Sequence, residues 1–150
     1  MRLMALSQSY KDIVQKVIGE WQWQSELNPG ATDAQLHRFE SANRISLPED
    51  LRYLYSQANG MLDVPDNHFF TFWPLENIVE YHGLTKKTID DHEFTEIAFG
   101  DFLIDSYRYS LVIDEEGKSS IWIDHSQQIS ADLEEFLNRW ISDPKSLCLM

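Results

Sequence analysis

The chain has 150 residues, of which 43% are hydrophobic and 13% aromatic, enough apolar material for a single domain with one core. The formal net charge is −13 at pH 7, divided into −3 for residues 1–87 and −10 for residues 88–150. An acidic C-terminal half repels phosphate backbones, so the charge argues against nucleic-acid binding and favours a basic protein partner. The simpler interpretation, that the acidity keeps the protein soluble, stays open at this point.

The cysteine content and the N-terminus indicate a compartment. The single cysteine, Cys148, allows no internal disulfide and suits a reducing environment. The apolar stretch 3–6 is far too short for a signal-peptide core, and no stretch approaches the length of a membrane span. We therefore expect a cytoplasmic protein without membrane contact.

Residues 9–23 are predicted to form an amphipathic helix, with Ser9 and Asp12 as a weak capping box. Its apolar positions form one continuous stripe: Tyr10, Ile13, Val14, Val17, Ile18 and Trp21. The opposite face has no run of basic residues. Packing on the domain's own core is therefore favoured over membrane or partner binding.

A second helix is predicted after Thr32, whose hydroxyl and the Gln35 side chain suit a capping box. Leu36 and Phe39 are expected to face inward, and Glu40 lies near the same apolar face. A carboxylate in that position is interpreted as a hydrogen-bond partner for backbone or for a nearby Arg or Tyr. The alternative role is that of a general base.

A third helix is predicted from Pro48, as its first residue, to a stop at Asn59-Gly60. Its inward stripe consists of Leu51, Leu54, Tyr55 and Ala58. Beyond it, the aromatic run 68–73 predicts a strand, for which core packing is favoured over a stacking platform. Pro74 then opens a short helix that ends at Gly83 and has Leu75, Ile78 and Val79 facing inward.

Residues 86–93 are polar, and their densest part is Asp90-Asp91-His92-Glu93. These side chains offer metal-ligand chemistry, but adjacent residues rarely converge on one ion, and no second histidine follows at helical spacing. The sequence also lacks a Gly-rich phosphate loop, a Gly-x-Ser-x-Gly elbow and a Cys-x-x-Cys pair. We expect no metal, no cofactor and no catalytic set.

The C-terminal half changes to period-two patterns. Strands are predicted at 96–99, 102–104, 107–113 and 119–123, with a hairpin turn at 114–117 in which Gly117 takes a positive φ. Trp122 points to the opposite face from Ile121 and Ile123, so either the tryptophan or the isoleucines are less buried. An exposed tryptophan there would mark a binding face.

The last helix is predicted to start at the cap Ser130, to bury one apolar stripe and to end at Asp143-Pro144, with a frayed tail beyond. The stripe consists of Leu133, Phe136, Leu137, Trp140 and Ile141. The elements together predict a single α+β domain. A mainly antiparallel sheet, about residues 69–123, is packed by the N-terminal helices and one C-terminal helix.

Several of these motifs, in this order, resemble the SUKH superfamily over roughly residues 30–141. The shared features are the mid-helix Glu40, the Leu47-Pro48 helix start, the Asn59-Gly60 helix end, the aromatic strand 70–73 with Pro74-Leu75, the Phe99-Gly100-Asp101 motif, in which the family usually has an aliphatic residue before Gly-Asp, and the closing helix 131–137. The superfamily contains yeast cell-wall-assembly regulators, Syd-like proteins and many bacterial toxin-immunity proteins. The resemblance agrees with the α+β fold.

The resemblance implies a non-enzymatic protein-binding module, most concretely an immunity protein that neutralises a basic toxin domain of nuclease type. It implies a structural role for the matched positions Glu40, Leu47, Pro48, Asn59, Gly60, Trp73 and Gly100. The predicted partner-binding surface is Asp101, Asp105, Asp114, Glu115, Glu116 and Asp124, with Asp90, Asp91 and Glu93 as outlying members. The alternatives are a regulatory scaffold of the cell-wall-regulator type and, less favoured, a metal-dependent hydrolase that uses residues 90–93.

Overall fold

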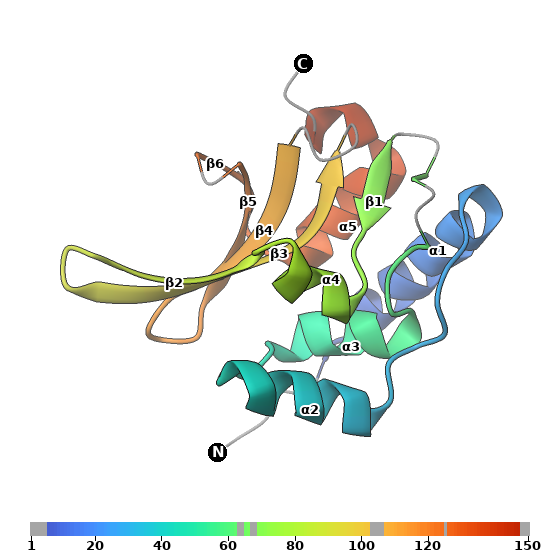
Figure 1. Ribbon diagram of the computed structural model, residues 1–150. Coiled ribbons are helices and arrows are strands. Elements are labelled where there is room, and N and C mark those ends of the chain that lie inside the picture. The colour runs from blue at the N-terminus through green and yellow to red at the C-terminus, as the bar shows by residue number, and fades with distance from the viewer. Residues whose placement is uncertain (1–5, 63–64, 67–68, 103–106, 125, 148–150) are drawn as a thin grey trace.

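The computed structural model describes residues 6–62, 65–66, 69–102, 107–124 and 126–147. Within them, five α-helices and six strands form one α+β domain, which confirms the predicted fold class (Figure 1). The helices are α1 (Gln8–Gln24), α2 (Asp33–Asn43), α3 (Glu49–Gln57), α4 (Leu75–Glu80) and α5 (Leu133–Ser142), followed by a 3₁₀-helix (Pro144–Leu147). The strands are β1 (Phe70–Phe72), β2 (Leu84–Ile89), β3 (His92–Phe102), β4 (Tyr107–Ile113), β5 (Ser119–Ile123) and β6 (Gln127–Ser130). None of these described helices has both the length and the apolar character needed to cross a bilayer.

The sheet is antiparallel in every pairing, with the order β1-β3-β4-β5-β6 and with β2 also paired to β3. The C-terminal part of β3 pairs with β1, and its N-terminal part pairs with β2. Residues 84–95 were predicted to form no strand, and β3 was predicted to be interrupted after Phe99; both predictions are wrong. β6 was not predicted, whereas the predicted bounds of β4 and β5 are confirmed. Residues 103 and 104 of the predicted strand 102–104 lie outside the described part of the chain.

The core lies between one face of the sheet and the helices α1 and α5 (Figure 1). The ring of Phe136 in α5 packs against Phe99 of β3, with centroids 5.6 Å apart. Trp21 of α1 stacks on Phe70 of β1 at 5.5 Å and contacts Phe72 at 5.2 Å. The aromatic residues of β1 are therefore core residues, which confirms the interpretation favoured over a stacking platform.

The other face of the sheet, called the outer face below, is only partly covered. Ile121 and Ile123 are fully buried toward the helices, whereas Trp122 between them is half-buried on the outer face. The indole N–H of Trp122 donates to the Ser120 hydroxyl at 2.9 Å. The segment after α4 lies at one end of this face, where the Tyr81 carbonyl accepts from the Arg108 guanidinium. The isoleucines are thus the more buried residues, and Trp122 is the less buried one.

The predicted apolar stripe of α1 is confirmed, because all six of its residues are buried. The cap is different, since Ser7 and not Ser9 accepts from the backbone N–H of Tyr10. The capping box of α2 forms as predicted: the Thr32 hydroxyl accepts from Gln35 N at 3.1 Å, and the Gln35 side chain accepts from Thr32 N at 2.8 Å.

The C-terminal segment is more ordered than predicted. Asp132, and not Ser130, caps α5 by accepting from Glu135 N at 2.8 Å. The predicted frayed tail is wrong as far as Leu147, which is 3% exposed and whose carbonyl accepts from the Tyr109 hydroxyl at 2.9 Å. One inward assignment is also wrong, since Val79 of α4 is 46% exposed.

Candidate protein-binding surface

The hairpin of β2 and β3 ends in an acidic two-residue turn. Asp90 and Asp91 both have positive φ, at 51° and 64°, and Ile89 pairs with His92 on either side of them. Two consecutive left-handed residues match the right-handed twist of a tight hairpin, and aspartate tolerates this conformation better than most residues. The turn therefore places two carboxylates at the tip of an exposed hairpin.

The hairpin of β4 and β5 ends in a second acidic turn. One carboxylate oxygen of Asp114 accepts from the backbone N–H groups of Glu116 and Lys118, each at 2.9 Å. Gly117 has a φ of 83°, which confirms the predicted turn residue. Because Asp114 holds the turn closed, Glu115 and Glu116 are exposed at its tip.

The two turns lie at the same end of the sheet and contact each other. Nδ1 of His92, at the start of β3, lies 2.6 Å from a carboxylate oxygen of Glu115. Both side chains are largely exposed, at 69% and 45%. Figure 1 shows both hairpins extending away from the helical part of the molecule. This contact was not predicted, because the only sequence signal for it is that a histidine and a glutamate, which can carry opposite charges, lie in two separate segments.

This surface is called the acidic hairpin end, and it consists of Asp90, Asp91, Glu93, Asp114, Glu115 and Glu116. The three residues predicted as outlying members lie next to the other three, because the His92–Glu115 contact joins the turns. His92 and Lys118 are the basic side chains that belong to the same two turns.

Asp101 and Asp124 do not belong to this end of the sheet. Asp101 is buried, and its carboxylate accepts from the indole N–H of Trp73 at 2.6 Å. Asp124 is half-buried with a φ of 52°, and its carboxylate accepts from the backbone N–H of Arg108. The prediction of Asp101 as a surface residue is wrong, and Asp124 has a local structural role. Asp105 lies outside the described residues.

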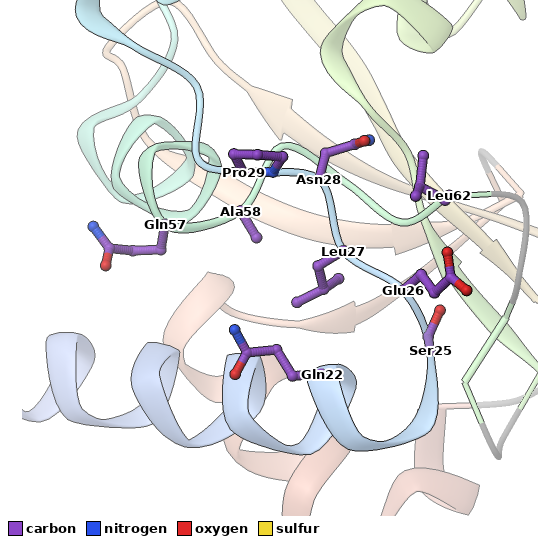
Figure 2. Close-up of a pocket in the computed structure, with 9 residues that line it drawn as sticks. All are labelled: Gln22, Ser25, Glu26, Leu27, Asn28, Pro29, Gln57, Ala58 and Leu62. Carbon is purple, nitrogen blue, oxygen red and sulfur yellow. The ribbon is translucent and has the colours of Figure 1, made fainter.

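A separate hollow of about 500 Å³ lies between the C-terminal end of α1 and the segment that follows it (Figure 2). Apolar parts of Leu27, Ala58 and Leu62 line it together with the amide side chains of Gln22 and Gln57. Among the described residues that line it, Glu26 is the one carboxylate, so this part of the hollow has little charge to select a basic partner.

The described groups with displaced pKa values lie away from the acidic hairpin end. Burial raises the pKa of Tyr10, whose hydroxyl donates to the Asp50 carbonyl, and burial also raises the pKa of the Asp50 carboxyl. Burial likewise raises the pKa of Tyr55, whose hydroxyl donates to the carbonyl of Trp73. Hydrogen bonds from the Ala131 N–H and then the Ser130 hydroxyl lower the pKa of Glu135. Each displacement has a structural cause at a helix or in the core.

The comparison with known protein families identifies the fold. The family model described as the SMI1 / KNR4 family (SUKH-1) matches residues 30–139, which is most of the chain. The chain belongs to the SMI1/KNR4 (SUKH-1) family. A comparison with curated protein sequences finds no match. The family match confirms the SUKH resemblance, and within this SUKH-1 domain the matched motifs have the following structural roles.

The observed start and end of α3 differ by one or two residues from those predicted from the Leu47-Pro48 and Asn59-Gly60 motifs. Pro48 is the N-cap residue and not the first helical one, and α3 ends at Gln57, after which Ala58 is extended. Asn59 is not a C-cap. Its side-chain oxygen instead accepts from Leu75 N at 2.9 Å and so ties the end of α3 to the start of α4.

The two glycines of the SUKH motifs permit close backbone contacts. Gly60 has a φ of 78°, and a Cβ at this position would lie 2.2 Å from the backbone nitrogen of Pro74. Gly100 lies in β3 beside β1, where a Cβ would lie 2.7 Å from the carbonyl oxygen of Thr71. Both positions need glycine because the neighbouring backbone occupies the space of a side chain.

Glu40 of the SUKH-1 domain has the hydrogen-bonding role that was favoured over a general base. One carboxylate oxygen accepts from Leu47 N at 2.8 Å, and the other pairs with the Arg52 guanidinium at 3.3 Å. Leu47 is buried, so Glu40 holds the connection between α2 and α3 against the core. Within the described residues, no group of three or more His, Cys, Asp or Glu side chains is arranged to hold a metal ion.

Proposed function

We propose that this SUKH-1 protein is a non-catalytic protein-binding module of the immunity type, which neutralises a basic toxin domain by binding it through the acidic hairpin end. The contact between His92 and Glu115 carries the proposal, because it makes one surface from two acidic turns that are more than twenty residues apart in the chain. Membership of the SUKH-1 family supports a protein-binding module. The immunity type is suggested by the resemblance to the SUKH superfamily, which includes many bacterial toxin-immunity proteins.

The charge of the surface supports a basic partner. Six carboxylates belong to the two turns and the start of β3, against one lysine and one histidine. Charges of one sign that lie within about 10 Å of each other act together on an approaching partner at 0.1 M salt. A toxin nuclease must itself be basic around its active site in order to hold a phosphate backbone. An acidic protein surface can therefore attract such a domain and cover the groove that binds its substrate.

The proposal is tested by co-purification of the tagged protein from its own cells under conditions that induce the partner, in low and in high salt. We expect a basic partner at low salt that is weakened or lost at high salt. Its nuclease activity should be absent in the complex and appear after dissociation. A partner whose activity is the same in the complex and alone would contradict neutralisation.

A regulatory scaffold of the cell-wall-regulator type is the second candidate, because the matching family model is that of SMI1 / KNR4. Such a scaffold has no need of a basic partner or of an enzymatic one. Recovery of a neutral partner that stays bound at high salt would favour this candidate over the immunity type.

A further inference from the structure

A hollow of about 300 Å³ opens on the outer face of the sheet, directly beside the acidic hairpin end. Its floor contains Phe94 of β3 and Val112 of β4, which are both half-buried. Ser120 of β5 pairs with Val112 in the ladder, and Gln128 of β6 pairs with the next outward residue of β5. Four neighbouring strands thus contribute residues to the same depression, with Ser119 of β5 as a further lining residue.

The lining combines an apolar floor with a polar rim. Phe94 offers the face or edge of an aromatic ring, and Val112 offers a surface against which an aliphatic chain can pack. The hydroxyl of Ser120 and the amide oxygen of Gln128 are hydrogen-bond acceptors. The carboxylate of Asp114 forms one side of the hollow.

The described residues that line the hollow include one acidic and one basic side chain, so the negative charge that favours a cation comes from the adjoining acidic hairpin end. Asp114 belongs both to the hollow and to the acidic hairpin end, so the remaining five carboxylates of that surface lie on the adjoining turns and at the start of β3. Lys118 also lines the hollow, but this residue is exposed and its flexible side chain can turn into solvent. Its backbone N–H, in contrast, is fixed to Asp114.

We propose that this hollow is the subsite for an arginine side chain of the basic partner, an inference that rests on the proposed function. The planar guanidinium stacks on an aromatic ring, is weakly hydrated and presents five donors. Its aliphatic stem lies along Val112, its plane lies against Phe94, and its N–H groups donate to Asp114 and to the acceptors on the rim. The acidic turns attract the partner, and the hollow fixes its position.

The subsite is tested without the partner, by ¹H–¹⁵N NMR titration of the full chain with N-acetyl-L-arginine amide. N-acetyl-L-citrulline amide, which has nearly the same shape but no charge, is the control probe. We expect saturable shifts at the amides of Phe94, Val112 and Ser120, with an affinity that is roughly millimolar for a ligand of this size. Equal chemical-shift changes with both probes would overturn the inference. Chemical-shift changes at the amides of the acidic turns, with none at the amides of Phe94, Val112 and Ser120, would also overturn it.

Two variants separate the charge from the ring. Asp114→Asn keeps a side-chain oxygen for the turn hydrogen bonds and removes the charge, and Phe94→Leu keeps an apolar floor and removes the ring. Each is expected to weaken binding of the arginine probe at least about fivefold while the remaining spectrum is unchanged. Asp12→Asn, at an exposed position on α1, is the matched control and should leave the affinity unchanged. Equal affinity in all four proteins would overturn the inference.

The proposed function and the arginine subsite can be refuted independently of each other. A partner complex that depends on Glu115 and Glu116, together with an arginine probe that does not bind the hollow, refutes the subsite and leaves the proposed function intact. An arginine probe that binds the hollow, together with a partner that ignores the charge of the two turns, supports the subsite chemistry and refutes the docking surface.

Discussion

Replacing Glu40 with alanine measures how strongly the connection between α2 and α3 is held. The carboxylate accepts from Leu47 N at 2.8 Å and pairs with Arg52 at 3.3 Å, and the two charged side chains are only 17% and 26% exposed. A hydrogen bond to a charged acceptor contributes about 1.5–3 kcal/mol, and an ion pair near the surface contributes about 0.5–1 kcal/mol. Glu40→Ala should therefore lower the free energy of unfolding by about 2–4 kcal/mol.

Two matched variants separate the contributions. Glu40→Gln keeps an acceptor for Leu47 N and should cost about 1 kcal/mol. Arg52→Met removes the ion pair with Glu40 together with a longer, exposed contact to Asp33 at 3.6 Å, and it should cost less than about 1 kcal/mol. Urea unfolding gives the three values, provided that the dependence of the free energy on urea concentration stays constant. A cost below about 0.5 kcal/mol for Glu40→Ala, or equal costs for alanine and glutamine, would refute this account of the α2–α3 connection.

Three further predictions concern the fold. Gly60→Ala combines a left-handed φ with a Cβ 2.2 Å from Pro74 and should lower the free energy of unfolding by about 3 kcal/mol. Gly117→Ala has a similar φ but no atom within 4 Å of the added Cβ, so it should cost about 1 kcal/mol in the same urea assay. Equal costs would contradict the close approach of the Pro74 backbone to Gly60. Leu147→Ala should lower the free energy of unfolding by about 2–3 kcal/mol because the side chain is 3% exposed. An unchanged melting temperature in thermal unfolding would instead support the predicted frayed tail. Glu135 has a lowered pKa in the folded state, so its stabilising contribution is full above the unfolded pKa of about 4.3 and is lost as the pH falls through the folded value. The stability difference between wild type and Glu135→Gln should therefore shrink between about pH 5 and pH 3, and a constant difference would contradict the assigned hydrogen bonds.

The helices could be predicted from the sequence because their signals are local. The stripe of α1 and the Thr32–Gln35 capping box depend only on neighbours within two turns, and both are found in the structure. The cap of α1 was displaced because Ser7 and Ser9 are equivalent candidates by residue type, and only the geometry of the first turn selects between them.

The strands and buried charges depend on distant residues, which a local pattern does not contain. β2 forms one edge of the sheet, and most of its side chains are exposed, so it lacks the alternation that marks a half-buried strand. Asp101 is an acidic residue with a surface-like character, and it is buried because Trp73, 28 residues away, donates to it. Leu147 is buried for a similar reason, since Tyr109 of β4 binds its carbonyl.

The acidic hairpin end was half predicted. Asp114, Glu115 and Glu116 could be named because they lie in a predicted hairpin turn, where side chains are exposed. Asp90, Asp91 and Glu93 were named only as the densest acidic part of a polar stretch, without a predicted hairpin. The proximity of the two turns could not be predicted, because it follows from the register between β3 and β4, in which Thr95 pairs with Ile113. That register places the turn at Asp90-Asp91 beside the turn at Glu115, and a single-sequence pattern does not determine it.

The most direct test of the acidic hairpin end is the association rate constant with the purified basic partner, measured by stopped flow at several ionic strengths. The protein with Glu115→Lys and Glu116→Lys is compared with a control that carries Asp12→Lys and Glu20→Lys on α1, which changes the net charge by the same amount at exposed positions. We predict that the hairpin variant associates roughly tenfold more slowly at low salt and has a shallower salt dependence, while the control stays close to wild type. Equal effects of the two charge reversals, or none from either, would contradict binding at this surface.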